Sequence, residues 1–293
     1  TQNFNFESLG FRPADTARVQ ESMKRTHGMI LANGPTGSGK TTTLYTLLKQ
    51  LNRPEVEVIT IEDPIEYSMD GATQIQVNNT SGLTFANGLR SILRQDPNIV
   101  MVCEIRDAET AAIAVNAALT GHLVLSTLHT NDSATTFPRL IDMGVPPFLV
   151  ASTINIAMGQ RLVRKLCEKC REERTLSVEE IKSLKEVLPE AEKMMDGKDI
   201  DNKGTQAKSK GKKFFVAKGC DGCGTTGYTG RIGVREVLEV NDEIRELIMK
   251  RGNASEIKAA AMRNGMTTMI QDGFMKAMTG LTTIEEVLRI IHE

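Results

Sequence analysis

One short glycine-rich stretch constrains the fold of this chain more than any other feature. It fits the pattern G-x-x-x-x-G-K-[ST] at every fixed position, follows an apolar run at residues 29–32 and leads into helical spacing at 41–51. That strand, loop and helix context is the one a phosphate-binding loop requires. The glycines let backbone N–H groups converge on phosphate, and the helix N-terminus adds its positive dipole end. The expected nucleotide-binding residues are Gly34, Pro35, Thr36, Gly37, Ser38, Gly39, Lys40, Thr41 and Thr42.

Two side chains of this loop have expected roles in holding a nucleotide. In loops of this pattern the lysine, here Lys40, reaches the β- and γ-phosphates, and the hydroxyl that follows, here Thr41, ligates Mg²⁺. The alternative is a glycine-rich turn that fits the pattern by chance, and the flanking strand and helix argue against it. The sequence therefore predicts binding of a nucleoside triphosphate, which we take to be ATP, together with Mg²⁺.

Length and charge exclude several other classes of protein. The chain has 293 residues, enough to bury a sizeable core, and its 36 basic and 37 acidic residues give a formal net charge of −1. This balance does not favour a nucleic-acid partner. No apolar run approaches the roughly 20 residues of a membrane span, and the polar start has no signal-peptide pattern. We expect a cytoplasmic protein and, because the sequence begins without Met, a fragment of a longer chain.

Acidic residues follow two of the predicted strands. The β-branched run at 56–61 ends in Glu62, and the apolar run at 99–102 is followed by Glu104. Ligands of open α/β sheets lie at the carboxyl ends of strands, so Glu62 is a candidate to position Mg²⁺ or water, with a solvated Asp-Pro turn as the alternative. An apolar strand ending in an acid is the Walker B arrangement, which makes Glu104 the candidate catalytic carboxylate. We expect Asp107 to cap a helix at 107–119.

Arginine and histidine side chains near these strand ends are further candidates. Arg90 and Arg94 are spaced to share one face of a helix at 83–95, either as phosphate clamps or as ordinary exposed charges. His122 and His129 flank a strand at 123–128. The period of a strand puts their side chains on opposite sides, which argues against a shared metal. His129, at the carboxyl end, is placed to sense the γ-phosphate or the attacking water.

Five cysteines include two C-x-x-C pairs, and this usage suits a bound metal in a reducing compartment better than a disulfide framework. Two such pairs followed by turn glycines suit tetrahedral Zn²⁺ with no open position for catalysis. A redox pair or free core thiols are the alternatives. The expected zinc ligands are Cys167, Cys170, Cys220 and Cys223.

The remaining patterns predict a three-part organisation of the chain. A core at 1–160 is followed by a cysteine-bearing arm at 161–230 and a helical region at 231–293. The lysine-rich run at 197–213 is either a solvated tether or a contact for an acidic lipid or partner. Further expected strands are 214–216 and 228–240, and further expected helices are 13–26, 132–144, 146–160, 177–188, 242–250, 255–264, 268–278 and 283–291.

The order of these motifs closely resembles the secretion ATPase family, the motor ATPases of type II secretion and type IV pilus assembly. The resemblance implies an α/β fold with a RecA-like P-loop core, a zinc-binding tetracysteine arm and a C-terminal helical region. It implies a hexameric ring that hydrolyses ATP, with Glu104 as the Walker B glutamate and Glu62 as the Asp-box acid. Its other implied site residues are the His-box pair His122 and His129 and the nucleotide-handling or interface arginines Arg90, Arg94, Arg106 and Arg139.

The same resemblance implies a cytoplasmic protein peripheral to the inner membrane, docked on an inner-membrane platform and a cytoplasmic adaptor. Two departures stand out. The family usually has Gly at the position of Cys103, directly before the glutamate, and its larger N-terminal domain is absent from this sequence. A RecA-like DNA translocase or conjugation ATPase is an alternative that the charge balance does not favour. A non-hydrolysing docking module is another, which the intact Lys40 and Glu104 argue against.

Overall fold

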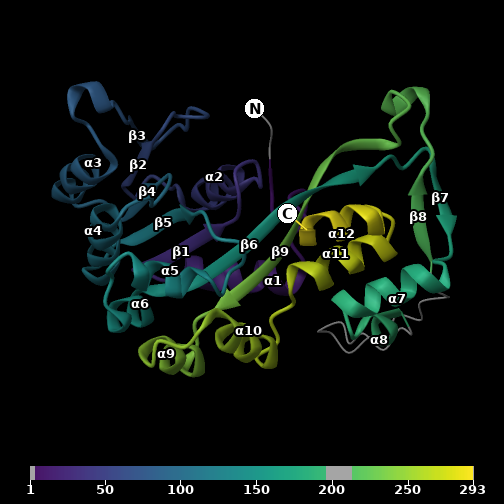
Figure 1. Cartoon of the computed structure of the whole chain (residues 1–293). Coiled ribbons are helices and arrows are strands. Elements are labelled where there is room, and N and C mark those ends of the chain that lie inside the picture. Colours follow the sequence, from purple (N-terminus) through teal and green to yellow (C-terminus); the bar gives the residue numbers. More distant parts are fainter. Residues whose placement is uncertain (1–3, 196–212, 293) are drawn as a thin grey trace. The chain divides into compact units, whose positions relative to one another are not determined.

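The computed structural model describes residues 4–195 and 213–292 (Figure 1). Packing divides the chain into two compact units. Unit 1 consists of Thr1–Gln160 and Glu236–Thr267, and unit 2 consists of Arg161–Arg235 and Thr268–Glu293. The chain therefore leaves unit 1 and returns to it. The three-part organisation expected from the sequence stays a prediction.

A seven-stranded sheet with the order β3-β2-β4-β5-β1-β6-β9 forms the frame of unit 1, and its last two strands continue into unit 2. All pairings from β3 through β6 are parallel. The carboxyl ends of these strands therefore lie along one edge, where ligands of such sheets bind. The strands are β1 Gly28–Asn33, β2 Val58–Glu62, β3 Thr73–Gln76, β4 Ile99–Val102, β5 Leu123–Leu128, β6 Ile154–Leu166 and β9 Tyr228–Glu239.

Helices cover both faces of this sheet, which explains why its strands are apolar on both sides. In β1, Met29 and Leu31 enter one core cluster, whereas Ile30 and Ala32 enter the other. The second of these clusters is completed by α1 Pro13–Met23 and α2 Lys40–Leu51. The first is completed by α3 Phe85–Ile92, α4 Ala108–Leu119, α5 Thr136–Asp142, α6 Pro147–Thr153, α9 Asp242–Met249 and α10 Ala254–Arg263.

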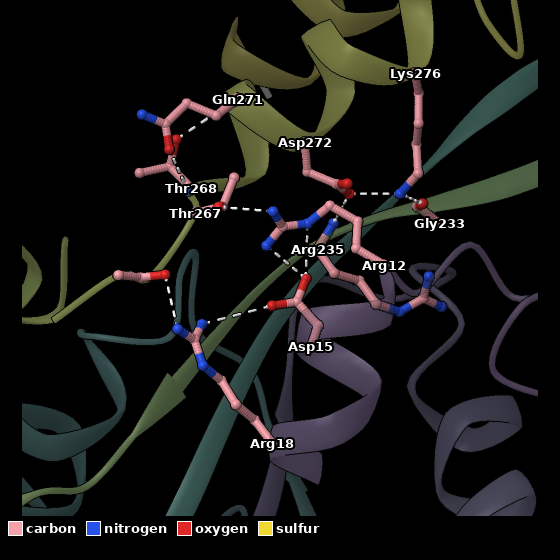
Figure 2. Close-up of polar contacts among 11 residues, drawn as sticks. Arg12, Asp15, Arg18, Gly233, Arg235, Thr267, Thr268, Gln271, Asp272 and Lys276 are labelled. Carbon is pink, nitrogen blue, oxygen red and sulfur yellow. Dashed lines mark hydrogen bonds and ion pairs between the residues drawn. The ribbon is translucent and has the colours of Figure 1, made fainter. Parts of the chain in front are cut away.

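A polar cluster fastens α1 within unit 1 (Figure 2). The buried carboxylate of Asp15 accepts a 2.9 Å hydrogen bond from Arg12 Nε. Arg12 also donates to Thr267 Oγ1 at 2.7 Å, and Arg18 donates to the carbonyl of Gly265 at 2.8 Å. The two arginines thus join the first helix to the segment that follows α10, far away in the sequence.

Unit 2 has a small sheet and a core of its own. β7 Arg171–Arg174 pairs antiparallel with β8 Phe214–Ala217, and Phe214 packs in a cluster with Phe274. Within this unit the Lys276 ammonium contacts Asp272 at 2.5 Å and the carbonyl of Gly233 at 2.7 Å (Figure 2). Its helices are α7 Val178–Val187, α8 Ala191–Met195, α11 Met269–Met278 and α12 Ile284–His292.

Several expectations need correction. The helix expected at 146–160 ends at Thr153, and residues 154–160 begin the strand β6 instead. All residues from Ile154 to Arg161 are buried, including the polar Asn155, Gln160 and Arg161, so no exposed polar side distinguishes a buried strand from a buried helix here. The helix expected at 83–95 ends at Ile92, followed by a 3-10 turn, Leu93–Gln95. Most of the lysine-rich run lies outside the described residues, and of its lysines only Lys213, which pairs with Glu173 at 2.6 Å, is described.

Candidate functional site

The phosphate-binding loop connects β1 to α2, as the sequence predicts. Its glycines Gly34, Gly37 and Gly39 have φ angles of 150°, 78° and 87°, which L-residues with side chains rarely adopt. A Cβ atom on Gly34 would lie 2.5 Å from both Ser38 Oγ and the carbonyl oxygen of Gln160. The first glycine of the motif is therefore required by space as well as by backbone conformation.

Lys40 begins α2 with its side chain folded back over the loop. Its Nζ donates to the carbonyl oxygens of Gly34 at 2.8 Å and Pro35 at 2.9 Å. Thr41 and Thr42 follow in the first helical turn, where backbone N–H groups lack partners within the helix. The hydroxyl of Ser38 is buried, and it has no hydrogen-bond partner in the described part of the chain. N–H groups, an ammonium and an unsatisfied hydroxyl form a donor set that fits a phosphate.

Glu104 lies directly beyond β4, on the same edge of the sheet. Its Oε1 lies 2.9 Å from Arg106 Nε and 2.8 Å from His129 Nε2, within ion-pair distance of both, and its side chain is 14% exposed. The preceding residue, Cys103, is held on both sides. Its N–H donates to the carbonyl of Ile61, and its carbonyl accepts from Thr127 Oγ1 at 2.8 Å. The structure thus brings Glu104 and His129 together and fixes the turn that carries the acid.

Glu62 occupies a different environment. The side chain is fully buried at the end of β2 and accepts hydrogen bonds from Tyr45 Oη at 2.5 Å, Thr60 Oγ1 at 2.6 Å and Gln74 Nε2 at 3.1 Å. Burial and the neighbouring carboxylate raise the pKa of Tyr45, so this tyrosine remains a neutral donor. These three bonds come from α2, β2 and β3, and the role of Glu62 toward Mg²⁺ or water stays a prediction.

Of the predicted arginines, Arg106 contacts Glu104, and the other three lie outside this group. Arg90 forms a 2.5 Å ion pair with Glu109 of α4, whereas Arg94, on the 3-10 turn after α3, and Arg139, on α5, are exposed. Their expected roles at the nucleotide stay predictions. His122 lies before β5 with its Nδ1 3.0 Å from the carbonyl of Ala117. The two histidines thus lie at opposite ends of β5.

Gln160 was not identified from the sequence, yet it contacts the phosphate-binding loop. From the buried part of β6, its Nε2 donates to the carbonyl of Ser38 at 2.7 Å, and its Oε1 accepts from Thr43 Oγ1 at 2.9 Å. It belongs to no motif, and it lies within residues that the sequence pattern assigned to a helix. Only a correct strand assignment for residues 154–160 could have placed Gln160 next to the phosphate-binding loop.

The four cysteines of the two C-x-x-C pairs converge in unit 2. Their sulfur atoms all lie within 4.8 Å of one another. Burial raises the pKa of Cys170 to about 12. At Cys223 burial acts in the same direction, but N–H donors from Cys220 and Gly227 outweigh it and lower the pKa to about 7. Four thiolates at this separation repel one another, so a cation is needed to hold them deprotonated, and the donor set is that of structural Zn²⁺.

The described residues include no helix that is long and apolar enough to span a membrane. Unit 1 combines a parallel α/β sheet with a phosphate-binding loop after β1 and an acid after β4, separated in the sheet by β5. This combination defines an α/β protein of the P-loop nucleotide-binding class.

Comparison with known families identifies the particular group. Residues 1–289 match the family described as type II/IV secretion system protein, and the chain belongs to this family. It is 46% identical over 292 residues to the type II secretion system protein E of Xanthomonas campestris pv. campestris, covering 99% of this chain and 48% of that protein. It is also 46% identical over 282 residues to the type IV pilus assembly ATPase PilB of Thermus thermophilus, covering 96% of this chain and 30% of that protein. The chain thus spans half or less of these relatives.

Solved structures agree with this assignment. The pilus retraction motor PilT with bound ADP superposes with a TM-score of 0.69 at 27% identity, over 99% of this chain and 67% of that one. The Legionella pneumophila ATPase DotB superposes with a TM-score of 0.65 at 25% identity, over 99% of this chain and 65% of that one. The resemblance and the α/β fold expected from the sequence are confirmed.

Proposed function

We propose that this chain is the ATP-hydrolysing domain of a motor that assembles a type IV pilus or the pseudopilus of type II secretion. The supporting observation is the placement of two groups in unit 1. Lys40 crosses a loop whose donor set fits phosphate, and Glu104 Oε1 lies 2.8 Å from His129 Nε2 at the same sheet edge. The 46% identity to proteins named for these two machines supports the assignment to either one.

In this proposal each group of the site has one task. The loop N–H groups and Lys40 hold the β- and γ-phosphates of ATP, and Thr41 provides the hydroxyl ligand for Mg²⁺, which neutralises phosphate charge. Glu104 accepts a proton from the attacking water. His129, which contacts the same carboxylate, orients it toward the γ-phosphate. Arginines complete the charge stabilisation, from Arg90, Arg94 or another copy of the chain.

The proposed assembly follows from the family. A homo-hexamer, docked on an inner-membrane platform and a cytoplasmic adaptor, would place the protein in the cytoplasm at the inner membrane. The names of the relatives, which belong to secretion and pilus machines, support this placement. The tetracysteine cluster would bind Zn²⁺ for a structural purpose, because four sulfur ligands leave no coordination position for substrate.

The decisive experiment compares ATP turnover and ATP binding in the wild type and in Glu104→Gln. Removing the proton acceptor should lower turnover by about 10²- to 10⁴-fold, while ATP binding changes little because the phosphate-binding loop is intact. Glu57→Gln is the matched control, since Glu57 is exposed before β2, and it should turn over ATP like the wild type. Equal turnover in Glu104→Gln would remove Glu104 from the mechanism. A wild type that binds ATP without hydrolysing it, also at concentrations at which it forms a hexamer, would favour a docking module instead.

A further inference from the structure

A phosphate-binding loop works only if its peptide groups point in one direction. When the N–H groups converge on the anion, the carbonyl groups of the same peptides turn outward into the protein. A buried carbonyl without a donor costs about 1–3 kcal/mol. The outward carbonyls of the loop must therefore find donors. Lys40 donates to the carbonyls of Gly34 and Pro35, and the N–H of Ser38 also donates to that of Pro35, at 3.3 Å.

The donor for Ser38, the residue two places before that lysine, comes from another strand. Gln160 Nε2 lies 2.7 Å from the Ser38 carbonyl oxygen. Both residues are buried, with exposed fractions of 0% for Gln160 and 3% for Ser38. Water therefore cannot easily replace the amide. A carbonyl only accepts hydrogen bonds, so the NH₂ end of Gln160 must be the end that faces Ser38.

The other end of the same amide is fixed as well. Gln160 Oε1 accepts from the hydroxyl of Thr43, at 2.9 Å, in the first turns of α2. This second bond sets the orientation of the amide plane and keeps the NH₂ group directed at the loop. The main-chain carbonyl of Gln160 also lies against Gly34, where a Cβ atom would come within 2.5 Å. One residue therefore contacts the beginning of the loop, its middle and the helix that follows.

We infer that Gln160 is a positioning residue for the nucleotide site, which holds the Ser38 carbonyl outward so that the loop N–H groups face the β-phosphate. The inference rests on the proposed function, because it takes the loop to bind ATP. Gln160 does not touch the nucleotide itself. Loss of its amide donor leaves the Ser38 peptide free to turn its carbonyl toward the phosphate, where it repels the anion.

The test measures binding of ADP with Mg²⁺, which requires no hydrolysis, by isothermal titration calorimetry. Gln160→Glu keeps the size of the side chain and the acceptor for Thr43 but places a carboxylate against the Ser38 carbonyl. We expect its Kd for ADP to rise about tenfold or more. Thr43→Val removes only the orienting bond and should raise the Kd about threefold. Thr46→Val is the matched control, since the Thr46 hydroxyl donates to Thr42 in the same helix, and it should bind as the wild type does.

Thermal unfolding of the nucleotide-free variants separates positioning from a purely structural role. A structural role predicts a lower unfolding temperature for Gln160→Glu with an unchanged Kd, and that result would overturn the inference. If Gln160→Glu does not fold, Gln160→Met, which also lacks the amide donor, is measured in its place. An unchanged Kd for ADP in Gln160→Met would likewise overturn the inference. A wild type that binds neither ADP nor ATP would refute the proposed function, and the inference with it. Binding in the wild type with equal binding in Gln160→Glu refutes the inference alone.

Discussion

Glu286 in unit 2 is a residue whose ionisation stabilises the fold. The side chain is buried, and its carboxylate accepts from the backbone N–H of Arg164 at 2.8 Å and from the guanidinium groups of Arg164 and Arg289. Burial raises the pKa of Glu286, but these hydrogen bonds and charges outweigh it and lower the pKa to about 2, from an ordinary value of 4.5. A lowered folded-state pKa means that the charged form is the one that stabilises the folded chain.

The stabilisation should therefore be complete above about pH 5 and should disappear as the pH falls from 4.5 toward 2. At pH 7 we expect Glu286→Gln to lower the free energy of unfolding by on the order of 3 kcal/mol. At pH 3 the difference between the variant and the wild type should be much smaller. Urea titrations followed by circular dichroism at both pH values measure it.

The adjacent Glu285 provides the control for this prediction. It pairs with Arg174 at 2.5 Å, but its side chain is 57% exposed, and solvent-exposed pairs contribute only about 0–1 kcal/mol. Glu285→Gln should therefore change stability little at either pH. A difference for Glu286→Gln that stays constant from pH 7 to pH 3 would show that the carboxylate charge is not the source of the stabilisation.

Single residues also show what the sequence could and could not predict at the site. Glu104 and Glu62 both follow apolar strands, and the pattern gave them similar environments. In the structure Glu104 contacts Arg106 and His129, whereas Glu62 is enclosed by Tyr45, Thr60 and Gln74. Arg106 and Thr60 are close to these acids in the sequence, but His129, Tyr45 and Gln74 come from other elements, and local patterning carries no information about them.

Among the elements, the strands of the sheet were the most predictable. The runs before the phosphate loop and before both acids are strands, because buried parallel strands require continuous apolar residues. β6 was mistaken for a helix because residues 154–161 are all buried, Asn155, Gln160 and Arg161 included, so polar residues do not mark a solvent-facing side. β3 and β7 were missed. Thr73–Gln76 and Arg171–Arg174 are largely polar and at least partly exposed, so their pairing partners determine their structure.

The tetracysteine cluster is the element whose metal content can be tested directly. We expect the purified chain to contain one zinc per chain by elemental mass spectrometry, and Cys170→Ser to lose most of it. Because structural zinc contributes several kcal/mol, the variant should unfold about 10 °C lower. Its affinity for ADP should be unchanged if the zinc is structural.

Cys103→Ser is the matched control for the zinc prediction. Cys103 is a free cysteine outside the cluster, so this variant should keep its zinc and its unfolding temperature should change less. Full zinc content in Cys170→Ser, or a wild type that takes up no zinc when it is refolded with the metal, would contradict the assignment.

For the whole molecule, motif order predicted the family and the fold. The three consecutive segments expected from the sequence stay a prediction. Packing groups Glu236–Thr267 in one unit with the phosphate-binding loop. Contacts such as that of Ser133 Oγ with Glu236 Oε1, at 2.8 Å, lie within that unit. They join residues more than a hundred positions apart in the sequence. Periodicity and turn signals describe only local structure and cannot predict such contacts.

The last prediction concerns assembly. Arg94 and Arg139 are exposed, and Arg90 is paired with Glu109. If an arginine of one copy completes the charge stabilisation at the phosphate of another, ATP turnover per chain must depend on association. We expect specific activity to rise with protein concentration in parallel with the appearance of a hexamer, measured by light scattering under the same conditions.

Two variants make this prediction specific. Arg139→Ala and Arg94→Ala should lower turnover of the assembled protein while ADP binding to the dilute chain is unchanged, because the loop of each copy is complete. Mixing either arginine variant with Glu104→Gln should restore part of the activity, since mixed rings contain interfaces with one intact acid and one intact arginine. Dilution of the protein to the molar mass of a single chain could leave the turnover per chain constant. Each copy would then be catalytically self-sufficient, and the arginines would be ordinary surface charges.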